Sequence, residues 1–255
     1  MKITIIGGGN MGGAIAQGLA HSKFTKPENI TVINSRRKAD YGSGIHSTTG
    51  DYSSLQGADI VILAVKPWLV REVLEEHADK LKSEKQILAS VAAGITLADL
   101  QQYTVDKKPL FRVMPNTAIA EQQSMTFISS INANHQQNNS IIELFNSLGK
   151  VEQIDEKLFS AATALSGCGI AYAFRYIRAS MEGGIEMGLT ADQSKNIVLQ
   201  TLRGAIELIE ANDSHPEAEI DKVTTPGGLT IKGLNAMEHA GFTSAVIKGL
   251  KASNI

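Results

Sequence analysis

The segment at residues 223–238, VTTPGGLTIKGLNAME, contains the residue types best suited to holding a small anion. Thr225 is a good helix N-cap, Pro226 suits the first helical position, and the glycine pair Gly227-Gly228 leaves backbone N–H groups uncovered. Unpaired N–H groups and the positive end of the dipole make a helix N-terminus a binding site for carboxylate or phosphate. The pattern therefore predicts an anion site where this helix begins.

Thr230 is the next polar side chain after this predicted site. It would lie about one and a half turns into the helix, where its hydroxyl can hydrogen-bond a group beside the anion. On spacing alone, an ordinary capped helix with a glycine-rich start remains the alternative.

A second glycine-rich turn follows the first apolar run, residues 2–6, and precedes a helix with apolar periodicity. Gly7, Gly9 and Gly12 fit the spacing GxGxxG. In that motif the first glycine makes the tight turn, the second admits a pyrophosphate, and the third lets helix and strand approach. Because the motif lies between a predicted strand and a predicted helix, we interpret it as a dinucleotide-binding turn rather than a structural one.

The end of the second predicted strand, residues 30–33, indicates which dinucleotide is preferred. NAD-binding sites usually place an acid on the ribose 2′-hydroxyl about 20 residues beyond the last glycine. In this chain the residue 22 positions beyond Gly12 is Asn34, which is not an acid. The sequence Ser35-Arg36-Arg37-Lys38 follows it. A guanidinium beside a hydroxyl suits a 2′-phosphate, which favours NADPH over NADH. A solvated basic helix start is the alternative.

Three further predicted strands end in short turns. The strands span residues 59–64, 86–91 and 110–113, and their turns contain Val65-Lys66-Pro67, Ala92-Ala93-Gly94 and Met114-Pro115-Asn116-Thr117. In a doubly wound α/β sheet, ligands bind outside the carboxyl ends of the strands. These turns are therefore predicted to lie at the coenzyme site.

A weaker strand is predicted at residues 125–129, followed by a helix that ends at Leu148. Near residue 153 the strand alternation gives way to helical periodicity. We predict an NAD(P)-binding domain over residues 1–153 and a helical domain over 154–255. In the helical domain, helices are expected at residues 157–165, 171–187, 190–212 and 215–223, and two more are expected to begin at residues 226 and 243. A break is expected at residues 166–169. Several of these helices are apolar nearly all round, which predicts that a second copy covers them; close crossing within the chain is the alternative.

Composition narrows the class of partner. With 24 basic and 26 acidic residues the net charge is −2, which argues against nucleic acid or a membrane surface as partner. The single cysteine, Cys168, and the short apolar run at the start favour a reducing cytoplasm. The six histidines lack metal-ligand spacing, so no metal site is expected, and we interpret Cys168 as packing rather than as a nucleophile. A small-molecule substrate is the remaining expectation.

The segment VTTPGGLTIKGLNAME resembles the signature VTSPGGTTxxGLxxLE of the pyrroline-5-carboxylate reductases. Further motifs resemble those of this family in the same order, namely GGGNMGGAIAQGL, LAVKP, SVAAGIT, RVMPNTA and ALSGCGIAYAF. The resemblance implies an N-terminal Rossmann-type domain and an all-α C-terminal dimerisation domain that interlocks with its partner. It also implies hydride transfer from NADPH to the C=N bond of 1-pyrroline-5-carboxylate, giving L-proline, in a homodimer or a higher assembly of dimers.

The resemblance also implies which residues hold each ligand. The coenzyme would be bound by the glycine turn, the 2′-phosphate pair and the strand-end turns: Gly7, Gly9, Asn10, Met11, Gly12, Ser35, Arg36, Ala64, Val65, Lys66, Pro67, Ala92, Ala93, Gly94 and Asn116. The substrate would be bound by Thr225, Gly227, Gly228, Thr230 and Glu156. For Glu156 the alternative is a helix-start carboxylate favoured by the dipole.

Four positions depart from the family pattern. Asp51 stands where the family often has Asn near the adenosine phosphate, and its charge opposes a phosphate, so NADH remains possible. Trp68 replaces a polar residue or His, Cys168 replaces Ser, and Ile170 replaces Pro.

Reduction of a cyclic imine needs a hydride donor, a fixed C=N carbon and a hydrogen-bond partner for the nitrogen. We expect the N–H groups of Gly227 and Gly228 to hold the substrate carboxylate and the Thr230 hydroxyl, as the catalytic group, to bind the ring nitrogen. Two alternatives are a hydroxyacid dehydrogenase, which needs a lysine or histidine at the alcohol oxygen, and a non-catalytic NADPH-binding protein. Lys195 and Lys222, two lysines of the helical half, are not in the GxxxKxxxN-like context of the first alternative.

Overall fold

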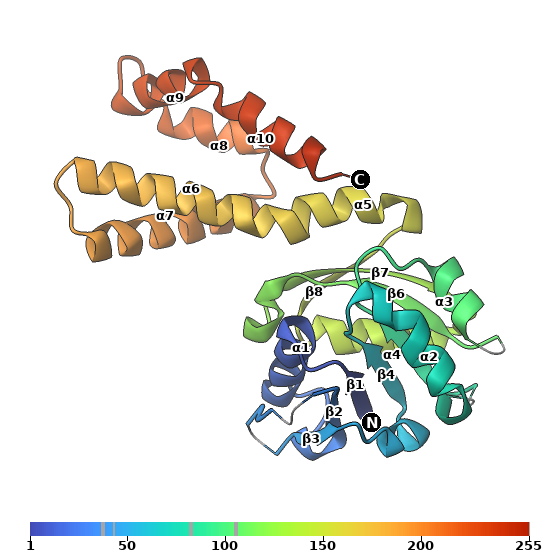
Figure 1. Ribbon diagram of the computed structural model, residues 1–255. Helices are drawn as coiled ribbons and strands as arrows, with labels where there is room; N and C mark the ends of the chain where they lie inside the picture. Colours follow the sequence, from blue (N-terminus) through green and yellow to red (C-terminus); the bar gives the residue numbers. More distant parts are fainter. Residues whose placement is uncertain (37–38, 43, 82–83, 105–106, 255) are drawn as a thin grey trace. The chain divides into compact units, whose positions relative to one another are not determined.

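The computed structural model describes residues 1–36, 39–42, 44–81, 84–104 and 107–254. The chain divides into two compact units, Met1–Gly167 and Cys168–Ile255 (Figure 1). The first unit contains a β-sheet with covering helices, and the second contains helices. Arg37 and Lys38, which belong to the basic run after Asn34, lie outside the described residues.

The described residues of the first unit form an eight-stranded sheet with strand order β3-β2-β1-β4-β5-β6-β7-β8. Neighbouring strands are parallel except for the antiparallel pair β6–β7. The strands are β1 (Ile3–Ile6), β2 (Ile30–Asn34), β3 (His46–Thr49), β4 (Ile60–Leu63), β5 (Ile87–Ser90), β6 (Leu110–Met114), β7 (Ser124–Ile131) and β8 (Gly149–Gln153). The predicted Rossmann-type sheet is confirmed.

Helices cover both faces of the sheet. They are α1 (Asn10–His21) and α4 (His135–Asn146) on one face, and α2 (Val70–Glu76) and α3 (Leu97–Tyr103) on the other. Ile5 of β1 packs in the core with Ile15 of α1, and its neighbour Ile6 packs in the opposite core with Leu74 of α2. Alternate residues of a strand point to opposite faces, so a strand covered on both sides is apolar throughout. Short 3₁₀ turns connect these elements: η1 (Pro27–Asn29), η2 (Ser53–Gly57), η3 (Pro67–Leu69), η4 (Ala78–Leu81), η5 (Thr117–Glu121) and η6 (Glu156–Leu158).

Two strands of the sheet were not predicted from the sequence. β3 has the sequence HSTT and β8 has GKVEQ, and in both strands every residue is at least partly exposed. They are the two outermost strands of the sheet, where one side of the backbone has no strand neighbour. A polar edge strand lacks the apolar alternation by which strands are recognised in a sequence.

The predicted break at residues 166–169 is wrong. The chain runs from α5 (Phe159–Ala162) through a π-helical turn (Thr163–Cys168) into α6 (Gly169–Glu186). The glycines of this segment, Gly167 and Gly169, have negative φ angles, so they continue the helix instead of ending it. The wider π turn accommodates the sequence without an interruption.

Residues 154–167 pack with the sheet, which places the division between units later than residue 153. The Phe159 side chain is buried, and the Arg112 guanidinium of β6 lies 4.6 Å above its ring centre. Asn116 Nδ2 donates to Ser166 Oγ at 3.1 Å. The strands do end at Gln153, but these contacts attach the next segment to the first unit.

The second unit has little core of its own. Its helices are α6, α7 (Ala191–Asn212), α8 (Pro216–Val223), α9 (Leu229–His239) and α10 (Phe242–Ala252). Among its described residues only Gly184 and Ser194 are buried. They touch each other, because a Cβ at Gly184 would lie 2.6 Å from Ser194 Oγ, so at Gly184 the close crossing is within the chain.

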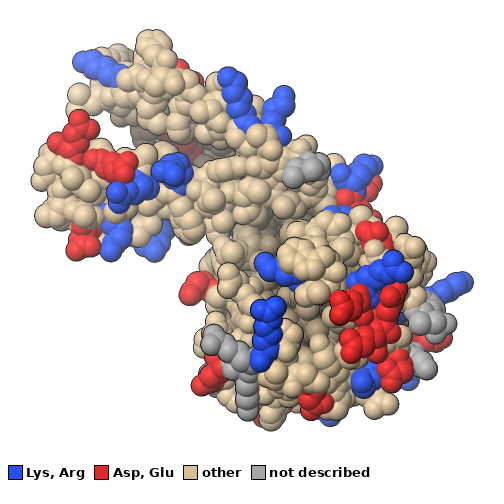
Figure 2. Space-filling model, viewed as in Figure 1, with Lys and Arg blue, Asp and Glu red and all other residues tan. Residues whose placement is uncertain are grey.

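Large apolar side chains remain exposed over the rest of this unit. Phe174 is 61% and Ile206 57% exposed. Figure 2 shows broad stretches of the visible surface of this unit without Lys, Arg, Asp or Glu. Large apolar side chains exposed in this number indicate an interaction surface. None of the helices in the described ranges has the length and apolar character needed to cross a bilayer.

A buried histidine, His77, is the C-cap residue of α2 in the first unit. The His77 side chain is 6% exposed, its ring stacks 3.7 Å from that of Tyr52, and its buried Nε2 has no partner among the described residues. Burial lowers the pKa of His77 because the imidazolium loses solvation. Of the nearby charges, Glu76 raises this pKa and Lys80 lowers it further.

This burial predicts a pH-dependent stability. Above the ordinary histidine pKa of about 6.5, His77 is neutral in both the folded and unfolded states. As pH falls below that value the unfolded chain binds the proton first, so the free energy of unfolding decreases. Urea titrations at pH 7.5 and 5.5 should show a smaller decrease for His77→Phe than for the wild type. An equal decrease in both proteins would contradict the account.

Candidate functional site

A cavity of about 630 Å³ opens at the carboxyl ends of β1, β2, β4 and β5. It is lined by Gly7, Gly8, Gly9, Asn10, Met11, Asn34, Ser35, Arg36, Ala64, Val65, Lys66, Pro67, Leu69, Val91, Ala92 and Ala93. This is the edge at which parallel sheets bind ligands. The cavity therefore brings together most of the coenzyme residues expected from the sequence.

The glycine turn has the geometry that the motif requires. Gly7 has a φ of +101° and donates its N–H to the Ile33 carbonyl at 2.9 Å, which ties the turn to β2. A Cβ at Gly12 would overlap the Gly7 carbonyl oxygen and lie 2.9 Å from Ala64 Cβ. Gly9, the N-cap of α1, has nothing within 4 Å of such an added Cβ. Gly12 thus serves helix–strand packing, and Gly9 leaves open space in the cavity.

The opposite wall is built by the turns after β4 and β5. Ala64 donates its N–H to the Ile6 carbonyl at 2.8 Å, and Ser90 Oγ accepts from the Ala92 N–H at 3.3 Å. Gly94 follows with a φ of +77°. These bonds hold residues 64–67 and 91–93 against the cavity with few polar side chains, which suits the flat face of an aromatic ring.

Some residues differ from the expected lining set. Gly12, Gly94 and Asn116 do not belong to the residues that line the cavity. Asn116 caps η5 by accepting from the Ala118 N–H at 3.0 Å, and its amide donates to Ser166. Four lining residues were not in the expected coenzyme set, namely Gly8, Asn34, Leu69 and Val91. Gly8, Asn34 and Val91 each adjoin an expected residue in the chain, and Leu69 lies two positions beyond Pro67.

Glu156 joins three elements of the first unit. Its Oε1 accepts from the Leu97 N–H at 2.8 Å and from Arg112 Nη1 at 3.0 Å. Leu97 is the first residue of α3, whose N-cap Thr96 forms a capping box with Asp99; hydrogen bonds from Thr96 hold the pKa of Asp99 below its usual value. Glu156 is the first residue of η6, and its carboxylate accepts at the start of a different helix, α3.

The predicted start of the helix after residue 225 is wrong. Helix α9 begins at Leu229 with Gly228 as its N-cap. Gly227 has a φ of +72° and forms a turn in which the Gly228 N–H donates to the Thr225 carbonyl at 2.9 Å. Because the left-handed residue breaks the helical path, Thr225 and Pro226 precede the helix instead of capping it.

This shift changes the position of Thr230. It is the second residue of α9, in the first turn, and not one and a half turns in. The first N–H groups of a helix have no acceptor within the helix, so those of Leu229 and Thr230 are available to a ligand. The Gly228 N–H is not available, because it donates to the Thr225 carbonyl. Leu229 is 86% exposed at this helix start.

Comparison with known proteins agrees with both units. Residues 156–254 match the family model described as pyrroline-5-carboxylate reductase dimerisation, and residues 2–94 match that described as NADP oxidoreductase, coenzyme F420-dependent. The chain is 36% identical to the pyrroline-5-carboxylate reductase of Glycine max over 98% of this chain and 93% of that protein. It is also 38% identical to pyrroline-5-carboxylate reductase 1 of Dictyostelium discoideum. That match covers 99% of this chain but 48% of the Dictyostelium protein.

A solved structure is similar over nearly the whole chain. The pyrroline carboxylate reductase of Plasmodium falciparum, crystallised with NADP bound, has a TM-score of 0.92 and 30% identity, with 99% of this chain and 95% of that chain covered. This chain belongs to the pyrroline-5-carboxylate reductase family. The resemblance inferred from the motifs is confirmed.

The structure places the four departures from the family pattern on or near turns. Asp51 accepts from the Ser53 N–H at 2.9 Å, a bond that lowers the pKa of its carboxyl. Trp68 lies in η3 and is 74% exposed. Cys168 ends the π-helical turn, and Ile170 is the second residue of α6.

The two glycines of the motif should respond differently to the same substitution. Gly12→Ser should lower the free energy of unfolding by about 1–3 kcal/mol, because its Cβ meets backbone. Gly9→Ser should leave stability within about 0.5 kcal/mol but weaken NADPH binding roughly tenfold, because its side chain enters the cavity. Urea unfolding and coenzyme titration measure the two effects. Equal stability losses would contradict the assigned roles.

Proposed function

We propose that this chain is a pyrroline-5-carboxylate reductase, which transfers hydride from NADPH to the C=N bond of 1-pyrroline-5-carboxylate and gives L-proline. The observation that carries the proposal is the family match over 98% of the chain, with both units included. The cavity at the sheet edge supports it, because it supplies a site for a dinucleotide.

The residues around this cavity fit NADPH. Gly7, Gly9 and the start of α1 would hold the pyrophosphate, since the first N–H groups of that helix are uncovered. Ser35 and Arg36 would hold the 2′-phosphate, with a hydroxyl and a guanidinium on the same wall. When bound, NADPH supplies the hydride.

The start of α9 would hold the substrate carboxylate. The Gly228 N–H is used within the chain, so we assign the carboxylate to the N–H groups of Gly227, Leu229 and Thr230. The Thr230 hydroxyl would bind the ring nitrogen and fix the C=N carbon for attack, with Thr225 beside it. Alignment accounts for most of the rate enhancement in such a reaction.

Thr230 would orient the nitrogen without being the main source of its proton. A threonine hydroxyl is too weak an acid to protonate an imine efficiently, so the iminium arrives protonated or takes its proton from water. Glu156 is already engaged by Leu97 and Arg112, and we assign it a positioning role at the β5–α3 turn.

The assembly would be a homodimer or a higher assembly of dimers, working in the cytoplasm. The match of residues 156–254 to a dimerisation model and the exposed apolar helices support this. Acidic and basic side chains are interspersed on the visible face of the first unit, which does not favour nucleic acid as a partner (Figure 2).

The activity is tested by following NADPH oxidation with 1-pyrroline-5-carboxylate and identifying the product. Oxidation with formation of proline is expected. Oxidation only with a keto acid would favour the hydroxyacid dehydrogenase type, and coenzyme binding without turnover of either substrate would favour a non-catalytic protein.

Thr230 variants test the substrate assignment. Thr230→Ala should lower kcat/KM by about ten- to a hundredfold, the value of one hydrogen bond to a charged group, whereas Thr230→Ser should be mild. Steady-state kinetics with varied 1-pyrroline-5-carboxylate measures the effect. Wild-type kinetics in Thr230→Ala would remove the assignment.

The assembly makes a separate prediction. Phe174→Asp places a charge on an exposed apolar face of α6 and should convert the oligomer to monomer in sedimentation experiments. Lys23→Asp, on the first unit, is the control and should leave the assembly unchanged. A monomeric wild-type protein would contradict the proposed dimer.

A further inference from the structure

Tyr41 connects two walls of the coenzyme cavity without lining it. Its hydroxyl oxygen lies 2.8 Å from the Gly8 carbonyl oxygen and 2.8 Å from Asn34 Oδ1. Gly8 belongs to the glycine turn and Asn34 ends β2, and both line the cavity. The contact is tight, since a Cβ at Gly8 would overlap the Tyr41 hydroxyl.

The Asn34 amide is held on both sides. Its Nδ2 donates to Ser47 Oγ at 3.2 Å and to the Thr48 carbonyl at 3.3 Å. A carbonyl can only accept, so the Thr48 oxygen determines which end of the amide faces β3. The Asn34 Oδ1 must then face Tyr41.

Tyr41 is a hydrogen-bond donor in this arrangement. Burial raises the pKa of the Tyr41 hydroxyl, although its bond to Asn34 opposes the shift, so it keeps its proton at neutral pH. One proton serves two acceptors, Asn34 Oδ1 and the Gly8 carbonyl. The Tyr41 hydroxyl thereby takes one of the two lone pairs of Asn34 Oδ1 and holds that oxygen toward the glycine turn.

Asn34 holds the position from which NAD-binding sites present an acceptor to the ribose 2′-hydroxyl. With its Oδ1 held by Tyr41, Asn34 is a weaker acceptor for a 2′-hydroxyl, and Ser35 and Arg36 on the same wall suit a 2′-phosphate. We propose that Tyr41 is a specificity-determining positioning residue, which competes with the ribose 2′-hydroxyl for Asn34 Oδ1 and thereby favours NADPH over NADH. This inference rests on the proposed use of NADPH.

Tyr41→Phe tests the inference because it removes the hydroxyl and keeps the ring beside α1. Asn34 Oδ1 then loses its competing donor and can accept more fully from the 2′-hydroxyl of NADH, whereas NADPH carries a phosphate there. One hydrogen bond gained by NADH should lower the ratio of the NADH Kd to the NADPH Kd by about three- to tenfold. A structural loosening of the turn would instead weaken both coenzymes and leave the ratio unchanged.

Coenzyme affinity can be measured without turnover. Trp68 is the single tryptophan of the chain, and its neighbours Pro67 and Leu69 line the cavity. Its emission overlaps the absorption of reduced nicotinamide, so quenching during titration reports binding of NADPH and NADH. Tyr103→Phe, which removes another tyrosine hydroxyl in the first unit, is the matched control and should leave the ratio unchanged.

A double variant tests whether Tyr41 acts through Asn34. In an Asn34→Ala background, Tyr41→Phe should no longer change the Kd ratio. An unchanged ratio in Tyr41→Phe alone, or the same shift in the absence of Asn34, would overturn the inference. If neither coenzyme quenches Trp68 in the wild type and calorimetry also detects no binding, the proposed function fails as well.

Discussion

The close approach of α1 to β1 is the constraint on which the coenzyme site depends. Gly12 lies so near the Gly7 carbonyl that no side chain fits between them. This contact brings the N-terminus of α1 to the carboxyl edge of the sheet, where its uncovered N–H groups face the cavity. The turns after β4 and β5 complete the cavity because the parallel register places their ends at the same edge. The buried sheet therefore fixes the site before any ligand binds.

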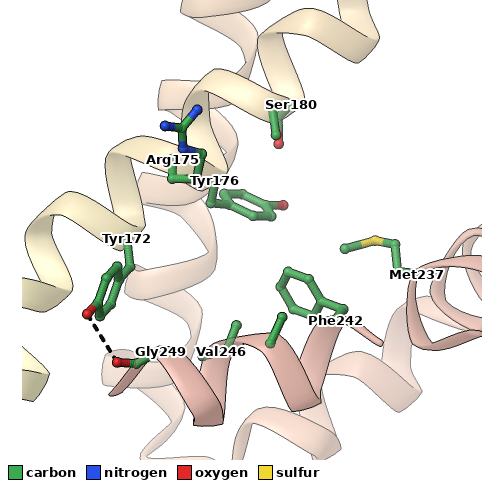
Figure 3. A pocket seen from close by; sticks show the side chains of 10 residues that line it. Tyr172, Arg175, Tyr176, Ser180, Met237, Phe242, Val246 and Gly249 are labelled. Atoms are coloured by element: carbon green, nitrogen blue, oxygen red, sulfur yellow. Dashed lines mark hydrogen bonds between the residues drawn. The ribbon is translucent and has the colours of Figure 1, made fainter. Parts of the chain in front are cut away.

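The helical unit meets a different constraint, since it cannot bury its own apolar side chains. The space between α6 and α10 illustrates this: Tyr172, Tyr176 and Phe242 border an open apolar cavity of about 530 Å³ (Figure 3). The Tyr172 hydroxyl lies 3.2 Å from the Gly249 carbonyl at its edge, which is one of few polar contacts there. A second copy would supply the missing core, so folding of this unit and assembly of the protein are expected to be linked.

The sequence predicted the parts of the fold that obey strong local rules. The central strands are continuous apolar runs, and the glycine spacing has a steric cause at Gly7 and Gly12, so both could be recognised. The edge strands β3 and β8 could not, because their polar residues carry no periodic signal. The start of α9 was misplaced because Thr225-Pro226 has good capping residues, and only the backbone shows that Gly227 adopts a left-handed turn first. Tyr41 was missed because its role depends on contacts with residues seven and thirty-three positions away.

The account divides the reaction between two structural elements: the sheet edge holds the reductant, and the start of α9 holds the acid to be reduced. A crystal structure of the protein with NADP⁺ and L-proline tests this most directly. We expect the pyrophosphate along Gly7–Met11 and the proline carboxylate on the N–H groups within residues 227–230. A proline carboxylate bound away from residues 224–230 would contradict the account.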